Sequence, residues 1–210
     1  MKTSAPRIES AIRDHLTPFL RADGFSGSGR TFRRTVGGWI HVVNVQGSRY
    51  GGQFAVNLAA HPIAIPDLRG DAPDPTKITE ELCEFRRRMS DSEARQDKWW
   101  KHEATTESMA AAVRDAADTY TRAGRRLLNE VTAENADLNI VTPEDFAAGR
   151  FNFLGFGSTE SRMALALARL RKAQGQSSQA QAFATYALEH AGTAAFLKTQ
   201  AQALIEQHDA

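Results

Sequence analysis

Apolar residues near the start of the chain recur every three or four positions between Ile8 and Leu20. This spacing places them on one face of a helix, which we predict over residues 4–22. Pro18 lies near the end of this stretch and lacks the backbone N–H that a helix interior needs, so a kink or an early stop is expected there. The glycine-rich stretch 24–29 that follows predicts a flexible loop.

Three stretches in the next part of the chain are bounded by turn residues, and the second is rich in β-branched residues, which is typical of β-strands; an alternating stretch further on is a plausible fourth strand. They lie at residues 30–36, 39–46, 53–60 and 81–89. Glycine pairs follow the first and second stretches, and such pairs favour tight hairpins. The first three strands are therefore expected to form an antiparallel meander. Four prolines make residues 61–77 a loop.

Alternation of side chains along these strands predicts which residues share a face of the sheet. In the third strand Phe54 and Leu58 share one face, which we expect to lie against helices. By the same rule Cys83 and Phe85 point toward this apolar face, and Glu84 points away from it. The opposite face is predicted to carry polar and charged side chains: Arg33, Asn44, Gln46, Gln53, Asn57, Arg86 and Arg88.

Alanine, the strongest helix former, is concentrated in the second half of the chain, with nine in residues 1–100 and twenty-five in residues 101–210. A long helix is expected over residues 105–131. Thr142, followed by a proline and two acids, predicts the start of another helix. Three further helices are expected, at residues 160–174, 178–190 and 193–207.

Together these elements predict an α+β fold: an antiparallel sheet of about four strands packed by helices on one face, with an all-α C-terminal extension. We expect two domains, an α+β domain at residues 1–132 and a helical extension at residues 140–210. A short group of amphipathic helices cannot bury its own apolar surface. The extension must therefore contact either the first domain or another chain.

The overall charge is balanced, with 26 Lys and Arg residues against 25 Asp and Glu residues and a formal net charge of +1. Net charge alone therefore gives no case for nucleic acid or a membrane surface as a partner. Cys83 is the only cysteine, which excludes an intramolecular disulfide. No apolar stretch approaches the about 20 residues that cross a bilayer, and no secretory signal is recognised. We expect a bacterial cytoplasmic protein with no membrane contact.

Several short motifs in a fixed order point to a known family. With them the chain resembles the bacterial domain of unknown function 4304 family over about residues 5–130. The resemblance implies an α+β domain and implies no activity, and it leaves residues 140–210 outside. The motifs are Gly24-Phe25 with Thr31-Phe32-Arg33-Arg34, Asn44-Val45-Gln46-Gly47-Ser48, Phe54-Ala55-Val56-Asn57-Leu58, Phe85-Arg86-Arg87-Arg88-Met89 and Asp97-Lys98-Trp99-Trp100.

A weaker resemblance concerns residues 163–191, where small and apolar residues are spaced as in a tetratricopeptide helical hairpin. Arg171 and Ala184 occupy positions that this pattern gives to tyrosine and to another aromatic residue. One such unit is also too short to form a repeat array. We therefore interpret the stretch as a helical hairpin of a general type, with the repeat family as the alternative.

The arginine-rich strand is the strongest candidate for ligand binding, because arginine forks bind carboxylate and phosphate groups. The tryptophan pair could stack on a ligand. The alternatives are a solvated face whose arginines pair with nearby acids, and a tryptophan pair that anchors the core and bridges to a helix. The candidate binding residues are Arg33, Asn44, Gln46, Asn57, Arg86, Arg88, Trp99 and Trp100.

The sequence contains no P-loop, no Gly-x-Ser-x-Gly motif and no metal-binding His/Cys spacing, so no catalytic residue, metal or cofactor is predicted. We expect a non-enzymatic binding or protein-interaction module, with a protein partner or a second copy on the C-terminal helices. One alternative is a nucleic-acid-linked role, in phage defence or toxin neutralisation, through Arg33, Arg86, Arg88 and the two tryptophans. Another is a hydrolase with its site on the polar sheet face.

Overall fold

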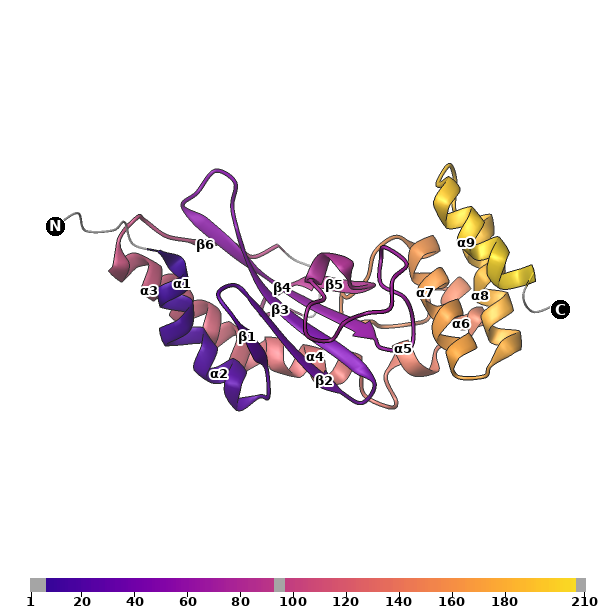
Figure 1. Cartoon of the computed structure of the whole chain (residues 1–210), viewed down its shortest axis with the longest axis horizontal. Helices are drawn as coiled ribbons and strands as arrows, with labels where there is room; N and C mark the ends of the chain where they lie inside the picture. Colours follow the sequence, from indigo (N-terminus) through magenta and orange to yellow (C-terminus); the bar gives the residue numbers. More distant parts are fainter. Residues whose placement is uncertain (1–6, 93–96, 207–210) are drawn as a thin grey trace.

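The computed structural model describes residues 7–92 and 97–206, which form a central sheet with helices along one face and a group of helices at one end (Figure 1). The sheet is antiparallel throughout, with strand order β1-β2-β3-β4-β5 and β6 paired to β4. The α+β class and the antiparallel arrangement are confirmed. The strands are β1 Ser26–Ser28, β2 Thr31–Val36, β3 Trp39–Gly47, β4 Gln53–Pro62, β5 Phe85–Arg88 and β6 Trp100–Lys101.

The sheet has six strands rather than about four, because two short edge strands lack a pattern of their own. β1 lies in the stretch that was expected to be a flexible loop, where Gly27 pairs with Phe32 of β2. β6 is two residues long and places Trp100 opposite Phe54. Such short strands form because a neighbouring strand offers unpaired backbone groups, which composition does not reveal.

The first helical segment is continuous through Pro18. It consists of α1 (Ile8–Ala11), a π-helical turn (Ile12–Leu16) and α2 (Thr17–Ala22). Of the two expectations for Pro18, the early stop is wrong, whereas the regular α-helix is interrupted just before it by the π-helical turn. The proline lies in the first turn of α2, where a missing N–H costs little.

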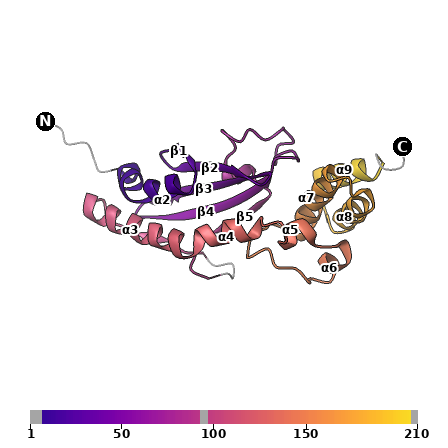
Figure 2. The ribbon, with the colours of Figure 1, turned by 90° about the horizontal axis from the view of Figure 1, so that it is seen from below.

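A long helical segment runs lengthwise along one face of the sheet (Figure 2). It comprises α3 (Thr106–Thr119), a π-helical turn (Tyr120–Gly124) and α4 (Arg125–Val131), close to the expected 105–131. Thr105 caps its start by accepting a hydrogen bond from the Ser108 backbone N–H at 3.2 Å. The apolar sheet residues beneath it are buried, among them Phe32, Val43, Val45, Phe54, Val56 and Leu58.

Part of the other sheet face is also covered, which corrects the expectation of a one-sided sheet. The segment between β4 and β5 folds back over it and forms a second apolar cluster, with members Ile40, Val42, Ala59, Ile78 and Cys83. Cys83 therefore lies on the face opposite Phe85, and Glu84 is buried instead of pointing to solvent. The strand alternation fails at both positions because Glu80–Leu82 form a 3-10 turn and β5 begins only at Phe85.

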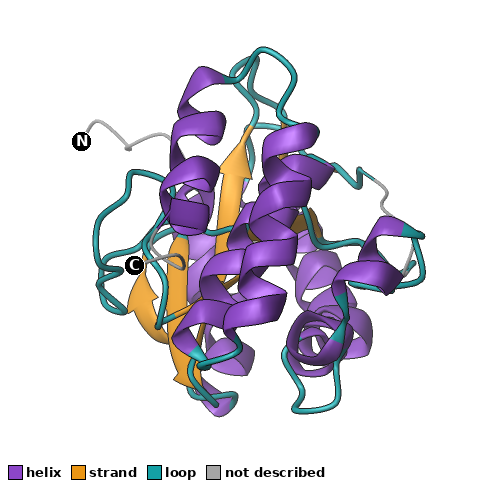
Figure 3. Ribbon diagram, turned by 90° about the vertical axis from the view of Figure 1, so that its right-hand side faces the viewer, coloured by secondary structure: helices purple, strands orange, loops and turns teal. Residues whose placement is uncertain are grey.

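The C-terminal helices lie at one end of the molecule, in front of the strands in Figure 3. Thr142 accepts a hydrogen bond from the Asp145 N–H at 3.1 Å, as its capping pattern predicts. Arg171 is buried and donates hydrogen bonds to the carbonyls of Leu138 and Val141, which fixes α5 on α7. The helices are α5 Asp137–Ile140, α6 Pro143–Ala147, α7 Glu160–Ala173, α8 Ser177–Glu189 and α9 Ala195–Glu206.

These helices share a hydrophobic core with the sheet. The Phe153 ring meets the Phe85 ring edge-on, with centroids 6.0 Å apart, and both belong to the main apolar cluster. Glu84 forms ion pairs with Arg162 and Arg169 of α7, at 3.4 and 3.5 Å. Within residues 7–92 and 97–206, no helix has the length and apolar character needed to cross a membrane.

Candidate binding site on the sheet

A row of polar side chains crosses the sheet from β3 to β5. Strand register places Asn44 opposite Asn57, and Asn57 opposite Arg88, so the three side chains lie on one face. The Asn57 amide nitrogen lies 3.3 Å from the Asn44 Oδ1, 3.1 Å from the Gln46 Oε1 and 3.2 Å from the Glu80 Oε1. Asn57 thus holds the centre of this face together.

Arg88 is held by three neighbours of different kinds. Its Nη1 donates a hydrogen bond to the Gln46 Oε1 at 2.9 Å, and its Nε lies 3.9 Å from Asp97. Its guanidinium carbon lies 4.9 Å from the centre of the Trp99 ring, which is a cation–π contact. These contacts fix the guanidinium at the rim of the site.

Arg86 has no comparable partner. The residue is partly buried, and its side chain forms no hydrogen bond or ion pair with any residue that the structure describes. The Arg86 carbonyl accepts a hydrogen bond from the Gly157 N–H at 3.0 Å, which brings the segment before α7 to the free edge of β5. The Ser158 Oγ is buried there and has no hydrogen-bond partner in the described part of the chain.

These groups line a polar pocket of about 260 Å³ on the sheet. Three arginines, Arg86, Arg87 and Arg88, and two carboxylates, Glu80 and Asp97, line the pocket. The Arg87 side chain is buried and bonded elsewhere, which leaves Arg86 and Arg88 against the two carboxylates. Burial raises the pKa of Glu80, the nearby Glu81 acts in the same direction, and the charge of Arg86 opposes them. The full lining is Gln46, Asn57, Glu80, Arg86, Arg87, Arg88, Asp97, Gly157 and Ser158.

Four of the eight candidate residues line this pocket, namely Gln46, Asn57, Arg86 and Arg88, and Asn44 adjoins it. Trp99 touches Arg88, as described. The other two are used elsewhere. Arg33 donates hydrogen bonds to the carbonyls of Lys77 and Ile78. Trp100 is buried, stacks on Phe54 and donates its indole N–H to Asp115.

The sequence reasoning did not select the other five lining residues, which are Glu80, Arg87, Asp97, Gly157 and Ser158. No local pattern connects residue 157 with residue 86, since only the tertiary fold brings them together. Gly157 itself carries a signal: its φ is +156°, and a Cβ there would lie 2.6 Å from the Met163 Sδ. A glycine at the end of an aromatic loop therefore indicates that the backbone is tightly packed where it reaches the sheet.

The described residues contain no group of three or more His, Cys, Asp or Glu side chains placed to hold a metal ion. Cys83 is buried, and burial raises the pKa of its thiol far above the ordinary value. The side chains that line the pocket are arginines, amides, carboxylates and a hydroxyl group, which can form hydrogen bonds and ion pairs with a ligand.

Comparison with known proteins assigns the chain to a family without assigning an activity. No curated protein and no solved structure was found to match it. One family model, described as Domain of unknown function (DUF4304), matches residues 16–122. The tetratricopeptide resemblance is not confirmed. The match covers half of the 210 residues and includes all six described strands and most of the long helical segment, so the chain belongs to the DUF4304 family.

Proposed function

We propose that this protein is a non-enzymatic binding module whose sheet pocket takes the carboxylate of an acidic ligand. The observation that carries the proposal is that Arg86, a partly buried residue, has no side-chain hydrogen bond or ion pair with any described residue and lines the pocket. Charged groups removed from water are normally paired. An anion in this pocket would give Arg86 a partner, and arginine can bind a carboxylate through two hydrogen bonds.

The composition of the lining favours a carboxylate over a phosphate. Glu80 and Asp97 lie in the same pocket as Arg86, so a second negative charge on the ligand would be repelled. The volume of about 260 Å³ is slightly below the roughly 300–1,000 Å³ of sites that enclose a whole small molecule. It suits one functional group, from a free carboxylate or from the acidic side chain of a partner protein.

The alternative functions receive less support from the same residues. A nucleic-acid surface needs free cationic and aromatic side chains, whereas Arg33 and Trp100 are both used inside the fold. A hydrolase needs a base beside its nucleophile, whereas the Ser158 Oγ forms no hydrogen bond with any described residue. These observations favour the binding module.

The proposal can be tested by titration calorimetry and by amide chemical shifts. Wild-type protein, Arg86→Gln and Arg150→Gln are titrated with succinate and with a short peptide rich in aspartate. Arg150 is an exposed arginine paired with Asp145 outside the pocket, so it serves as the matched control. We expect Arg86→Gln to weaken carboxylate binding by about tenfold or more, since a charge-assisted hydrogen bond is lost, and Arg150→Gln to have no effect.

The two carboxylate sources give different results. Saturable binding of succinate indicates a free carboxylate as ligand, and binding of the peptide alone indicates a segment of a partner protein. Equal binding by wild type and Arg86→Gln would contradict the proposal. A single-stranded oligonucleotide that binds more tightly than either carboxylate, with an affinity that falls steeply with salt, would instead favour the nucleic-acid alternative.

A further inference from the structure

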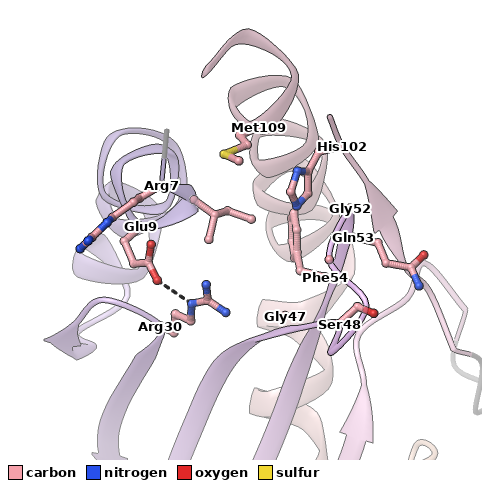
Figure 4. Close-up of a pocket in the computed structure, with 12 residues that line it drawn as sticks. Arg7, Glu9, Arg30, Gly47, Ser48, Gly52, Gln53, Phe54, His102 and Met109 are labelled. Carbon is pink, nitrogen blue, oxygen red and sulfur yellow. Dashed lines mark hydrogen bonds and ion pairs between the residues drawn. The ribbon is translucent and has the colours of Figure 1, made fainter. Parts of the chain in front are cut away.

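Helices α1 and α3 begin at the end of the molecule away from the C-terminal helices (Figure 1), and a second, larger pocket lies beside them (Figure 4). It lies between α1, the β3–β4 hairpin and the start of α3, and its volume of about 420 Å³ falls within the roughly 300–1,000 Å³ of small-molecule sites. Its lining shares no residue with the pocket around Arg86.

The pocket has an apolar side. Ile8, Phe54 and Met109 line it, and each of these side chains is buried in the main core. The Phe54 ring is held by stacking on Trp100, with centroids 5.7 Å apart and an interplanar angle of 14°. His102 lies beside the same ring, with centroids 6.2 Å apart. A flat apolar group would meet preformed, rigid side chains here.

Arg30 supplies a positive charge on the opposite side of the pocket (Figure 4). Its Nε donates a hydrogen bond to Glu9 at 2.8 Å, and its two terminal nitrogens have no acceptor among the residues that the structure describes. The guanidinium lies directly over Gly47, where an added Cβ would be 2.7 Å from Nη1. Gly47 thus allows Arg30 to occupy this position, with its free N–H groups available to a ligand.

We infer that this pocket binds a compact organic anion, such as an aromatic carboxylate. The apolar body lies against Ile8, Phe54 and Met109, and the carboxylate accepts hydrogen bonds from the terminal nitrogens of Arg30. Glu9 keeps the guanidinium oriented through its Nε, which leaves the terminal nitrogens as a fork for a planar acceptor. Arg7 extends away from the pocket in Figure 4, so Arg30 is the cation that selects the ligand.

The test compares phenylacetate with its neutral analogue phenylacetamide, by titration calorimetry and amide chemical shifts. Two variants address Arg30 in different ways. Arg30→Gln removes the charge, and Gly47→Ala keeps the charge but displaces the flexible end of Arg30. We expect each variant to weaken phenylacetate binding by about tenfold or more, and phenylacetamide to bind wild type more weakly by a similar factor. Arg150→Gln and Arg86→Gln serve as controls that leave phenylacetate binding unchanged.

Each other outcome overturns the inference. It fails if phenylacetate does not bind wild type at millimolar concentration, or if the acid and the amide bind equally well. It also fails if Gly47→Ala binds as wild type does while giving a native spectrum, which remains decisive even where Arg30→Gln does not fold. Loss of phenylacetate binding in Arg86→Gln would assign the ligand to the sheet pocket instead.

Discussion

Arg86 and Arg87 are neighbours in β5, yet their side chains have opposite environments. Arg87 lies on the covered face opposite Leu58, is buried, and donates hydrogen bonds to the carbonyls of Leu154 and Ser92. Arg86 lies on the other face with no partner among the described residues. Because successive side chains of a strand point to opposite faces, Arg87 binds backbone carbonyls inside the fold, whereas Arg86 is available for a ligand.

The surroundings of two buried histidines, His41 and His61, lower their pKa values. The His41 Nδ1 accepts a hydrogen bond from the Arg34 side chain, and its Nε2 lies 2.9 Å from the Thr132 Oγ1. Burial, together with the charge of Arg34, lowers its pKa to about 3. Burial lowers the pKa of His61 to about 4. Both are therefore neutral in the folded protein over most of the acidic range.

Because both histidines are neutral in the folded protein, we expect acid to destabilise the fold. Below the ordinary histidine pKa of 6.5, the unfolded chain takes up protons at His41 and His61 that the folded chain does not. The free energy of unfolding should therefore fall as pH decreases from 6.5 to 4, by about 3 kcal/mol for each histidine. Urea unfolding across this range measures the effect, and the double variant His41→Gln/His61→Gln should show a shallower slope. An unchanged slope would contradict the assignment.

At the scale of elements, β5 joins the two parts of the chain. It pairs with β4 on one side and forms an isolated bridge to Gly157 on the other. The family match ends at residue 122, so Gly157 and Ser158 come from outside it. The pocket around Arg86 is thus closed by a segment that the family model does not include.

The β1–β2 hairpin offers a test of an unpredicted element. Gly27 has a φ of +120°, and a Cβ there would lie 2.4 Å from the Thr31 carbonyl oxygen. We expect Gly27→Ala to lower the free energy of unfolding by about 1–3 kcal/mol. Gly29→Ala is the matched control, because Gly29 also has a positive φ but would meet no atom within 4 Å. Its cost should stay near 1 kcal/mol. Equal costs in urea unfolding would argue against a formed β1.

For the whole molecule, the continuous core predicts that the sheet and the C-terminal helices unfold together. The three tryptophans, Trp39, Trp99 and Trp100, all belong to the sheet part, whereas far-UV circular dichroism also reports the C-terminal helices. We expect both signals to change at the same urea concentration. Phe153→Ala removes the ring that meets Phe85 and should shift both transitions by about 3–5 kcal/mol. Separate midpoints in wild type would indicate two independent domains.

The sequence by itself determined the features that depend on local periodicity. Strand alternation predicted that Asn44 and Asn57 share a face with Arg86 and Arg88, and helical spacing predicted the long segment from 105 to 131. The family was also recognisable from short motifs in order. These features are encoded by neighbouring residues, because strand and helix geometry repeats over two to four positions.

Only the tertiary structure decided which of those polar residues remain free to bind a ligand. Arg33 and Trp100 find partners in Lys77 and Asp115, whereas Arg86 finds none among the described residues. Glu80 and Ser158 join the pocket from separate segments. Such pairings depend on backbone carbonyls and loops that lie dozens of positions apart in the sequence. Residue type alone does not predict which of these distant groups the fold brings together.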